Sequence, residues 1–325
     1  MATKTITFPE TFPDSVTLKN NIQDTVTYSW ALPNFTEYNI SSWLNNFQGE
    51  VFPKEDEERI ALWLLSNYTH YNEKEVEHLC KTLYKKFIHT YVTDQSLTEK
   101  TLLESMKNFC YIPLGSASES GGFIAYQFRK QAKIGIDRFF FPTENGSING
   151  NVAIFIDDVT LSATQAKDPI TDFVKNHSFD SVYLLTLISS SKAEQELLQN
   201  GIKTISCIEI DERNKCFSGQ SILFHKFPDL LDPIKDFCTH YGSKVFRSYP
   251  LGYKDGQYLF GFFYNTPNNT LPIFWSNKNG WVPIFERKEK IKTDARVVGK
   301  LQMPAHRDAV GQTSGEMAKF SWWKT

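Results

Sequence analysis

Residues 151–165 of this chain read NVAIFIDDVTLSATQ, and this stretch decides the fold. An almost continuous apolar run reaches Ile156, and two acids, Asp157 and Asp158, follow it. Such runs are typical of parallel strands that are buried on both faces of a sheet. Small hydroxylated residues come next, and then a helical pattern at 163–176. We therefore predict a buried strand that ends in two carboxylates, followed by a tight turn and a helix.

The same alternation of strand and helix continues on both sides of this stretch. The flanking segments predicted as strands are CYIPLG (110–115), SVYLLTLI (181–188) and KTISCIEI (203–210). Those predicted as helices are FIAYQFRKQ (123–131) and KAEQELLQNG (192–201), which Gly201 ends. This order predicts an α/β fold with a doubly wound parallel sheet. Such sheets bind ligands at the carboxyl ends of their strands, where Asp157 and Asp158 are expected.

The chain changes character along its length, and four regions are expected. They are an N-terminal mainly helical region (1–108), the α/β core (109–245), an aromatic-rich β segment packed on the core (246–290) and a C-terminal tail (291–325). In the first region, apolar residues at helical spacing predict helices at Glu55–Asn67, at Glu73–Tyr91 and from Thr98 onward. Residues 1–38 contain TKTITF and SVTL, which could be short strands.

The composition argues against several classes of protein. A net charge of −2 speaks against a free-standing nucleic-acid binder, because phosphate contacts require a strong basic excess. The five cysteines form no CxxC pair, so we expect buried free thiols rather than a zinc site or a disulfide framework. We find no signal-peptide pattern and no apolar run of ~20 residues, so a cytoplasmic protein without membrane contact is expected. His70, His78 and His89 are expected at the surface.

The acid pair is the strongest candidate for chemistry. The carboxylates of Asp157 and Asp158 can accept hydrogen bonds from the vicinal hydroxyls of a ribose. The turn and the helix N-terminus that follow offer backbone N–H groups to a phosphate. The candidate phosphate-binding residues are Leu161, Ser162, Ala163, Thr164 and Gln165. The alternative interpretation is a buried strand that merely ends in solvated acids.

A second candidate anion site lies one strand–helix unit before the acid pair. A Gly/Ser-rich loop follows the strand at 110–115 and opens a helix, so its backbone N–H groups suit an anion. On its own this loop would be interpreted as a plain connection, and its place before the acid pair favours a binding role. Its candidate residues are Gly115, Ser116, Ser118, Glu119, Ser120 and Gly121. Arg129, Lys133 and Arg138 follow and could meet phosphate, although a solvated surface charge is the interpretation that we favour for each.

Two further segments allow a structural and a functional interpretation. After the strand at 181–188, Ser191 and Glu194 fit a helix capping box, which we favour over a role in lining the pocket. In the aromatic region we expect core side chains at Phe260, Phe262, Phe263, Phe274, Trp275 and Trp281, and turn formers at Asn265, Asn268 and Asn269. The alternative is that this turn closes over the nucleotide pocket and contacts the base.

Residues 153–165 resemble the phosphoribosyl pyrophosphate (PRPP) signature of type I phosphoribosyltransferases, which has four apolar residues, two acids and a Thr/Gly-rich turn. This chain departs from that signature at Leu161, Ala163 and Gln165. Over roughly residues 40–290 the chain also resembles a phosphoribosyltransferase-like family of bacterial conflict and antiphage systems, including some retron operons. The resemblance rests on WLNNF, SESGGFIAYQFR, IFIDDVTLSATQ and YPLGYKDGQYLFGFFYNTPNNTLPIFWSNKNGWVPIF.

The resemblance implies a type I phosphoribosyltransferase-like core that binds PRPP or a nucleotide and catalyses glycosyl transfer or nucleotide cleavage. Asp157 and Asp158 would be the catalytic pair and hold Mg²⁺ indirectly, through ribose or water. The loop at 115–121 would bind pyrophosphate, under a hood formed by residues 133–149.

The resemblance also implies an effector of antiphage defence, with a reverse transcriptase and its msDNA, or a winged-helix protein, as partner. It leaves a homo-oligomer open. Two alternatives remain for the function. One is a catalytically inactive nucleotide sensor. The other is a partner-binding subunit of a retron-type complex, docked through the basic tail at 287–307.

Overall fold

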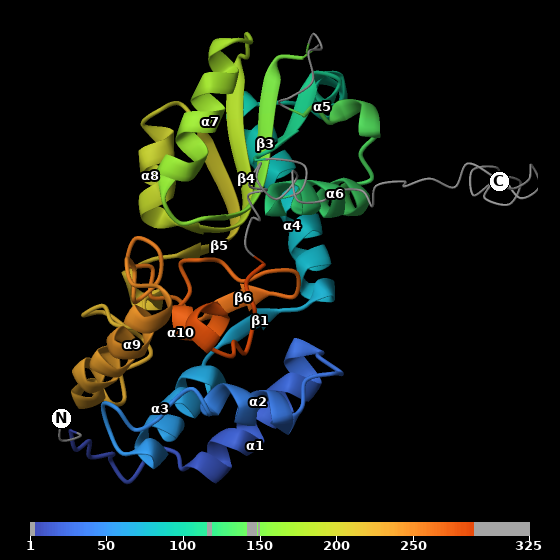
Figure 1. The fold of residues 1–325 in the computed structure, drawn as a ribbon. Coiled ribbons are helices and arrows are strands. Elements are labelled where there is room, and N and C mark those ends of the chain that lie inside the picture. The colour runs from blue at the N-terminus through green and yellow to red at the C-terminus, as the bar shows by residue number, and fades with distance from the viewer. Residues whose placement is uncertain (1–3, 116–118, 142–147, 149, 289–325) are drawn as a thin grey trace, which may run out of the picture. The chain divides into compact units, whose positions relative to one another are not determined.

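A parallel sheet of four strands forms the core of the fold (Figure 1). The computed structural model describes residues 4–115, 119–141, 148 and 150–288. In sheet order the strands are β2 (Phe109–Pro113), β3 (Val152–Thr160), β4 (Ser181–Ser190) and β5 (Lys203–Ile210), and each neighbouring pair is parallel. The four strands predicted from the sequence are therefore confirmed.

A helix follows each of the first three strands of this sheet, as the sequence predicts. They are α6 (Ser120–Ala132) after β2, α7 (Ala163–Lys175) after β3 and α8 (Ser191–Leu198) after β4. Side chains of β3 alternate between two hydrophobic clusters, because successive residues of a strand point to opposite faces. Ile154 and Ile156 pack with Phe128 of α6, whereas Ala153 and Phe155 pack with residues of α7 and α8. Because helices cover both faces, the sheet is doubly wound.

The connection between β2 and β3 reverses the direction in which the sheet grows. After α6 the chain returns to the outer edge of β2, where Phe139 forms a parallel bridge with Tyr111 and the Phe140 N–H donates to the Tyr111 carbonyl at 2.9 Å. β3 then pairs with β2 on its other side. Because such crossovers are right-handed, the two directions put α6 on one face and α7 and α8 on the other. The carboxyl ends of β2 and β3 therefore flank the topological switch point, where doubly wound sheets bind ligands.

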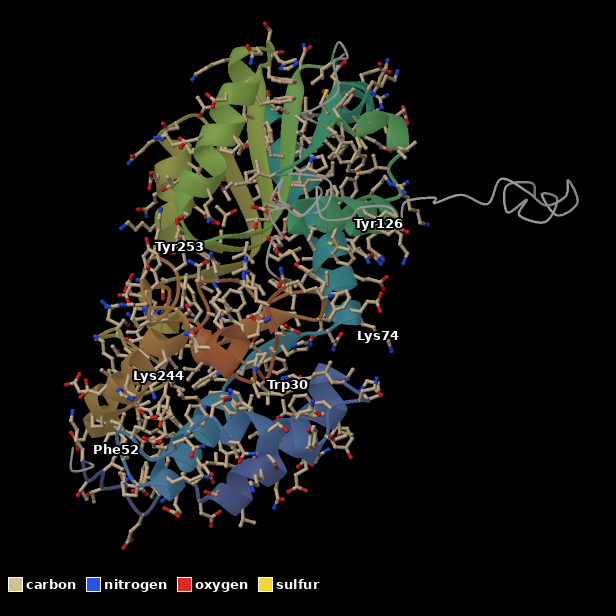
Figure 2. All side chains as sticks on the ribbon, viewed as in Figure 1. Trp30, Phe52, Lys74, Tyr126, Lys244 and Tyr253 are labelled. Carbon is tan, nitrogen blue, oxygen red and sulfur yellow. The ribbon has the colours of Figure 1, made fainter. Side chains whose placement is uncertain are left out.

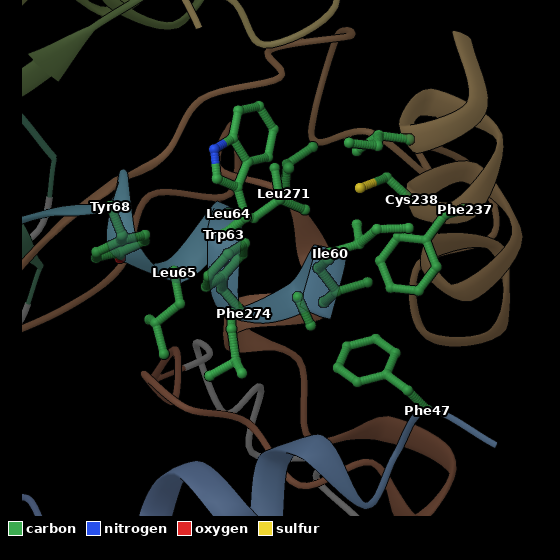
Figure 3. Packing of buried hydrophobic residues seen from close by; sticks show 14 of the residues in the cluster. Phe47, Ile60, Trp63, Leu64, Leu65, Tyr68, Phe237, Cys238, Leu271 and Phe274 are labelled. Atoms are coloured by element: carbon green, nitrogen blue, oxygen red, sulfur yellow. The ribbon is translucent and has the colours of Figure 1, made fainter. Parts of the chain in front are cut away.

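The N-terminal helices share a hydrophobic cluster with segments from the second half of the chain. Its elements are α1 (Ser15–Thr25), α2 (Glu37–Leu44), α3 (Lys54–Ser66), α9 (Leu231–Val245) and α10 (Pro272–Trp275). Figure 3 shows the side chains of α3 packed with Phe237 of α9 and Phe274 of α10. We call this group the first core.

A short two-stranded sheet lies between the first core and the α/β core. In it β1 (Thr69–Tyr71) pairs in parallel with β6 (Phe260–Phe262). The next helices are α4 (Glu73–Gln95) and α5 (Glu99–Met106). Val76, Leu83 and Phe87 of α4 pack in the same cluster as Ile154 of β3. The helix predicted at 73–91 thus covers one face of the main sheet.

Three segments differ from the sequence prediction. Residues 15–18 (SVTL) begin α1 instead of forming a strand, because the Asp14 carboxylate accepts the Thr17 N–H as an N-cap and the helix buries Leu18 and Ile22 one turn apart. The described part of TKTITF, residues 4–8, forms no strand either. Residues 272–275 (PIFW) form α10, with proline at the first helical position, where it is well tolerated.

The division into four regions stays a prediction. Residues up to Lys288 form one compact unit, and the tail at 291–325 lies outside the described residues. Within the part of the chain that the structure describes, we find no helix with the length and apolar character that a bilayer crossing requires.

Candidate active site

The acid pair stands just beyond the end of β2. Pro113, the last residue of β2, pairs with Ile156, so Asp157 and Asp158 are the first residues of β3 without a partner on that side. On its other side β3 continues to Thr160 and stays paired with β4. The sequence predicted that the strand ends at the acids, and this is wrong. The longer β4 pairs with β3 for two more residues. The pair lies at the switch point.

The Gly/Ser-rich loop after β2 reaches this pair. Gly115 turns the chain with a φ of +87°, a conformation that glycine adopts without strain. Helix α6 then begins at Ser120, whose hydroxyl donates to Asp158 Oδ1 at 3.1 Å. The two elements that the sequence singled out are thus in direct contact. Ser116 and Ser118 of the predicted loop lie outside the described residues.

Gly121 sets how closely α6 approaches the strands. A Cβ at this position would lie 2.1 Å from the carbonyl oxygen of Leu114 and 3.4 Å from that of Ile156. Both neighbours are backbone atoms, which cannot turn aside as a flexible side chain can. The absence of a side chain therefore lets the first turn of α6 lie beside the acids, with Glu119 as its N-cap.

Tyr264 is a further partner of the pair, and sequence reasoning missed its role. Its hydroxyl donates to Asp158 Oδ2 at 3.2 Å, while Ser120 bonds the other oxygen of that carboxylate. The Tyr264 ring stacks on Phe262 of β6 at 5.2 Å and packs against Phe123 of α6 at 4.7 Å. Its only signal in the sequence was its place in the aromatic turn that could close over the pocket.

The two carboxyl groups are half-buried, and each accepts the N–H of the residue after it at 2.9 Å. Burial raises the pKa of Asp157 well above its usual range, and the charges of Asp158 and Glu119 raise that pKa further. Burial also raises the pKa of Asp158, against the lowering effect of its hydrogen bonds. Hydroxyl donors or a cation bound at this site would stabilise the carboxylates, because either favours the ionised form of an acid.

The predicted phosphate-binding residues form a short turn and the start of a helix. Leu161 and Ser162 are the turn between β3 and α7, and Ala163, Thr164 and Gln165 form the first turn of α7. The Ser162 side chain makes no capping bond, and the first turn of α7 holds no acid. The N–H groups at this helix start therefore suit an anion.

Lys254 adds a positive charge to the start of α7. Its ammonium donates to Thr164 Oγ1 at 2.9 Å. The residue follows Tyr253, which is labelled in Figure 2, in a loop where Lys254, Asp255 and Gln257 all have positive φ. Sequence reasoning missed Lys254, because YKDG on its own indicates only a turn.

The three predicted basic residues lie elsewhere. Arg129 is in the last turn of α6, at the opposite end from Ser120, and Lys133 is the C-cap of that helix. Arg138 donates to the Lys107 carbonyl, just before the amino end of β2. The structure does not bring them to the acid pair, because α6 runs away from it. Much of the predicted hood, residues 142–147 and 149, lies outside the described residues.

The N-cap of α8 is Ser190 and not Ser191, which corrects the predicted capping box by one residue. Ser190 Oγ accepts the Ala193 N–H at 3.1 Å, because β4 extends to this residue. The Glu194 carboxylate instead accepts the hydroxyls of Ser189 and Ser206, the latter at 2.8 Å. These bonds tie α8 to the end of β4 and to the middle of β5.

The predictions for cysteine and histidine have different outcomes. All five cysteines are free thiols, and burial raises the pKa of Cys80, for example, to about 12. His78 and His89 are exposed, as predicted. His70 is not, because β1 packs its ring against Phe285, and its exposed fraction is 6%. Among the described residues, no cluster of three or more His, Cys, Asp or Glu side chains is arranged to hold a metal.

A family model matches most of this chain, and a solved structure is similar to part of it. A model of the PRTase-CE family matches residues 40–287, a range that contains the site. No match is found among curated proteins. Among solved structures, the crystal structure of orotate phosphoribosyltransferase from Aeropyrum pernix is similar at 13% sequence identity and a TM-score of 0.26. That match covers 33% of this chain and 61% of the other, so the chain spans less than two thirds of that protein's length.

Proposed function

Because the chain belongs to the PRTase-CE family, we propose that the site at Asp157 and Asp158 binds PRPP or a nucleotide and catalyses glycosyl transfer or nucleotide cleavage. One observation carries the proposal: the pair stands at the switch point between the starts of two helices. The first turn of α6 contacts Asp158 through Ser120, and α7 begins shortly after the pair. PRPP has the matching pattern, because its ribose hydroxyls lie between the 5′-phosphate and the pyrophosphate at C1.

In this proposal the acids hold the ribose. Its vicinal hydroxyls donate to the carboxylates of Asp157 and Asp158. Negative charge beside the ring also stabilises the positive charge that develops at C1 as the leaving group departs. Because both carboxyl groups have a raised pKa in the described structure, ligand binding favours their ionised form and releases protons.

Mg²⁺ fits the donors of this site. The ion prefers oxygen ligands, and in phosphate-binding sites it uses one or two carboxylates together with phosphate oxygens and waters. Asp157 and Asp158 supply the carboxylates, and Glu119 adds to the negative field that raises the pKa of Asp157. When bound, Mg²⁺ would offset the charge of the pyrophosphate.

The helix starts would hold the charged ends of the ligand. The first turn of α6 is assigned to the pyrophosphate, because it lies beside Asp158. The first turn of α7 is assigned to the 5′-phosphate, with Lys254 as its cation. Backbone N–H groups at both starts can donate to phosphate oxygens without a change of conformation.

The proposed transfer breaks the bond between C1 of the ribose and its leaving group, and the electron pair stays with that group. The leaving group is pyrophosphate from PRPP or the base from a nucleotide. A nitrogen or oxygen atom of the acceptor forms the new bond to C1 and passes its proton to solvent or to the acid pair. With water as the acceptor, the same steps give cleavage.

The proposed biological role is that of an effector in a bacterial antiphage defence system, active in the cytoplasm. It rests on the family resemblance, which also suggests a reverse transcriptase with msDNA, or a winged-helix protein, as partner. The turn at 161–165 favours one second candidate, a nucleotide sensor without catalysis. There Ala163 is buried and stands where the PRPP signature has a glycine. The backbone at this position therefore lacks the conformational freedom that a glycine would give.

Titration calorimetry with PRPP and Mg²⁺, followed by product analysis, tests the proposal. The wild type should bind, and the Asp157→Asn/Asp158→Asn variant should bind at least about 100-fold more weakly, because charge-assisted hydrogen bonds to the ribose are lost. Asp168→Asn, an exposed acid on α7, is the matched control and should bind as the wild type does. Unchanged affinity of the double variant would exclude the site. Binding of PRPP, ATP or NAD without product would favour the sensor.

A further inference from the structure

A separate cavity of about 300 Å³ lies beside β1 and β6. Its lining includes the aromatic residues Phe35, His70, Phe262, Phe263, Tyr264 and Phe285. Neutral amide groups, among them that of Asn265, border the same space. Glu286 and Lys288 are the charged residues of the lining, and they carry opposite signs.

This cavity is distinct from the acid pair. His70 packs against Phe285 at 5.1 Å and Trp30 at 6.1 Å, toward the first core. The next residue of β1, Tyr71, points to the opposite face and stacks on Phe262 at 5.2 Å. The Tyr264 ring that bonds Asp158 lies on the Phe262 side. The wall at His70 and the acid pair are therefore on opposite faces of the two-stranded sheet, and Tyr264 borders both.

His70 is the unusual member of the wall. Its exposed fraction is 6%, and neither ring nitrogen has a hydrogen-bond partner. Buried polar groups are nearly always paired, so two unpaired nitrogens beside a cavity indicate a partner that enters it. The nitrogens do not face the open space in the described orientation. A half-turn about the Cβ–Cγ bond exchanges each nitrogen with a ring carbon, and so can present a nitrogen to the cavity.

The chemistry of the wall limits the class of ligand. Burial lowers the pKa of His70 to about 4, so the imidazole is neutral at physiological pH and offers one N–H donor and one acceptor. Aromatic walls favour a planar ring, and a lining of balanced charge does not select a phosphate. The volume is at the lower end of the range for small-molecule sites, which suits a single heterocycle rather than a whole nucleotide.

We infer that this cavity binds a planar, uncharged nitrogen heterocycle of nucleobase size, with His70 as its polar contact and the rings of Phe35 and Phe285 as its apolar walls. The inference does not depend on the proposed function, because His70 and Phe285 have no part in the acid pair. Since Tyr264 borders the cavity and bonds Asp158, a bound heterocycle is placed to affect the acid site.

The test uses the full-length protein and three probes: adenine, uracil and nicotinamide. We expect calorimetry or ligand-observed NMR to detect binding of at least one of them to the wild type. His70→Phe keeps an aromatic ring but removes both nitrogens, so it should bind that probe at least about tenfold more weakly. Its melting temperature should equal or exceed that of the wild type, because two unpaired buried atoms are gone. His78→Phe, an exposed histidine on α4, is the control and should bind normally.

Two results would overturn the inference: no binding of any probe at millimolar concentration, or equal affinity in His70→Phe and the wild type. The Asp157→Asn/Asp158→Asn variant separates this site from the proposed function. It should lose PRPP but keep the heterocycle, whereas His70→Phe should keep PRPP. Loss of the heterocycle in the double variant would mean that the two sites are one, and would also overturn the inference.

Discussion

At the scale of single residues, the acid pair lowers the stability of the folded protein when no ligand is present, but it favours the binding of a ligand. Asp157 and Asp158 are adjacent and half-buried, so burial raises the pKa of both, and the charge of Asp158 raises the pKa of Asp157 further. Ser120 and Tyr264 each donate one hydrogen bond to Asp158. Such raised pKa values are common among acids in active sites and binding sites.

The raised pKa of Asp157 predicts how stability depends on pH. The folded protein keeps the proton of this group where the unfolded chain, with an ordinary value near 3.8, has lost it. Stability therefore falls as the pH rises from about 4 through the raised pKa. Asp157→Asn does not ionise, so without ligand its melting temperature should exceed that of the wild type by roughly 3 °C or more at pH 8, and by less at pH 4.

Thermal unfolding followed by circular dichroism at both pH values measures this difference. Asp168→Asn serves as the control, because Asp168 is an exposed acid on α7 that lies outside the pair. A melting temperature of Asp157→Asn that is below that of the wild type at pH 8 would show that the ionised carboxylate stabilises the fold.

The sequence predicted some residues of the site and not others, for a physical reason. Asp157 and Asp158 were found because the chemistry and the strand that positions them are adjacent in the chain. Tyr264, Lys254 and His70 were not, because their roles arise from contacts with segments far away in the sequence. Tyr264 reaches Asp158, for example, across 106 positions.

At the scale of the elements, continuous apolar runs made the strands of the main sheet predictable. α1 was missed, because β-branched residues at its start favour a strand and its N-cap, Asp14, lies just after a proline. The end of β3 was also misplaced, since the length of β4 and not the acids decides where it stops. The switch point depends on the bridge at Phe139, which no local pattern indicates.

The contact between α6 and the strands predicts a sharp effect of one methyl group. In Gly121→Ala the new Cβ would meet the Leu114 carbonyl oxygen at 2.1 Å, so the start of α6 must move away from the acids. We expect a loss of about 1–3 kcal/mol in the free energy of unfolding, measured with urea, and a clear loss of PRPP affinity. Gly219→Ala is the control, because its Cβ would have no heavy atom within 4 Å. Wild-type affinity in Gly121→Ala would mean that α6 does not form the site.

At the scale of the whole described chain, the sequence did not predict that the N-terminal helices pack with α9 and α10. Patterns along the chain show which face of a helix is buried, but not which distant segment covers it. Glu57 illustrates the point, since an acid near a helix start is usually a solvated residue that favours the helix dipole. Here it is fully buried and accepts the N–H groups of Gly49 and Val51 at 2.7 Å and the Tyr241 hydroxyl at 2.5 Å.

Glu57 therefore joins α3 to α9 and to the segment before α3. Glu57→Gln replaces one accepting oxygen with an amide that donates, so at least one buried N–H or hydroxyl loses its partner. We expect a loss of about 3 kcal/mol in the free energy of unfolding, measured with urea. Glu58→Gln, which loses only a surface ion pair with Lys54 at 3.8 Å, should change it by less than about 0.5 kcal/mol. Equal effects of the two variants would refute the role given to Glu57.

A crystal structure of the protein with PRPP and Mg²⁺ would show whether the acid pair holds a ribose. We expect ribose hydroxyl oxygens within about 3 Å of carboxylate oxygens of Asp157 and Asp158, with phosphate groups at the starts of α6 and α7. A ligand bound elsewhere, or bound here with its ribose turned away from both carboxylates, would contradict the proposal.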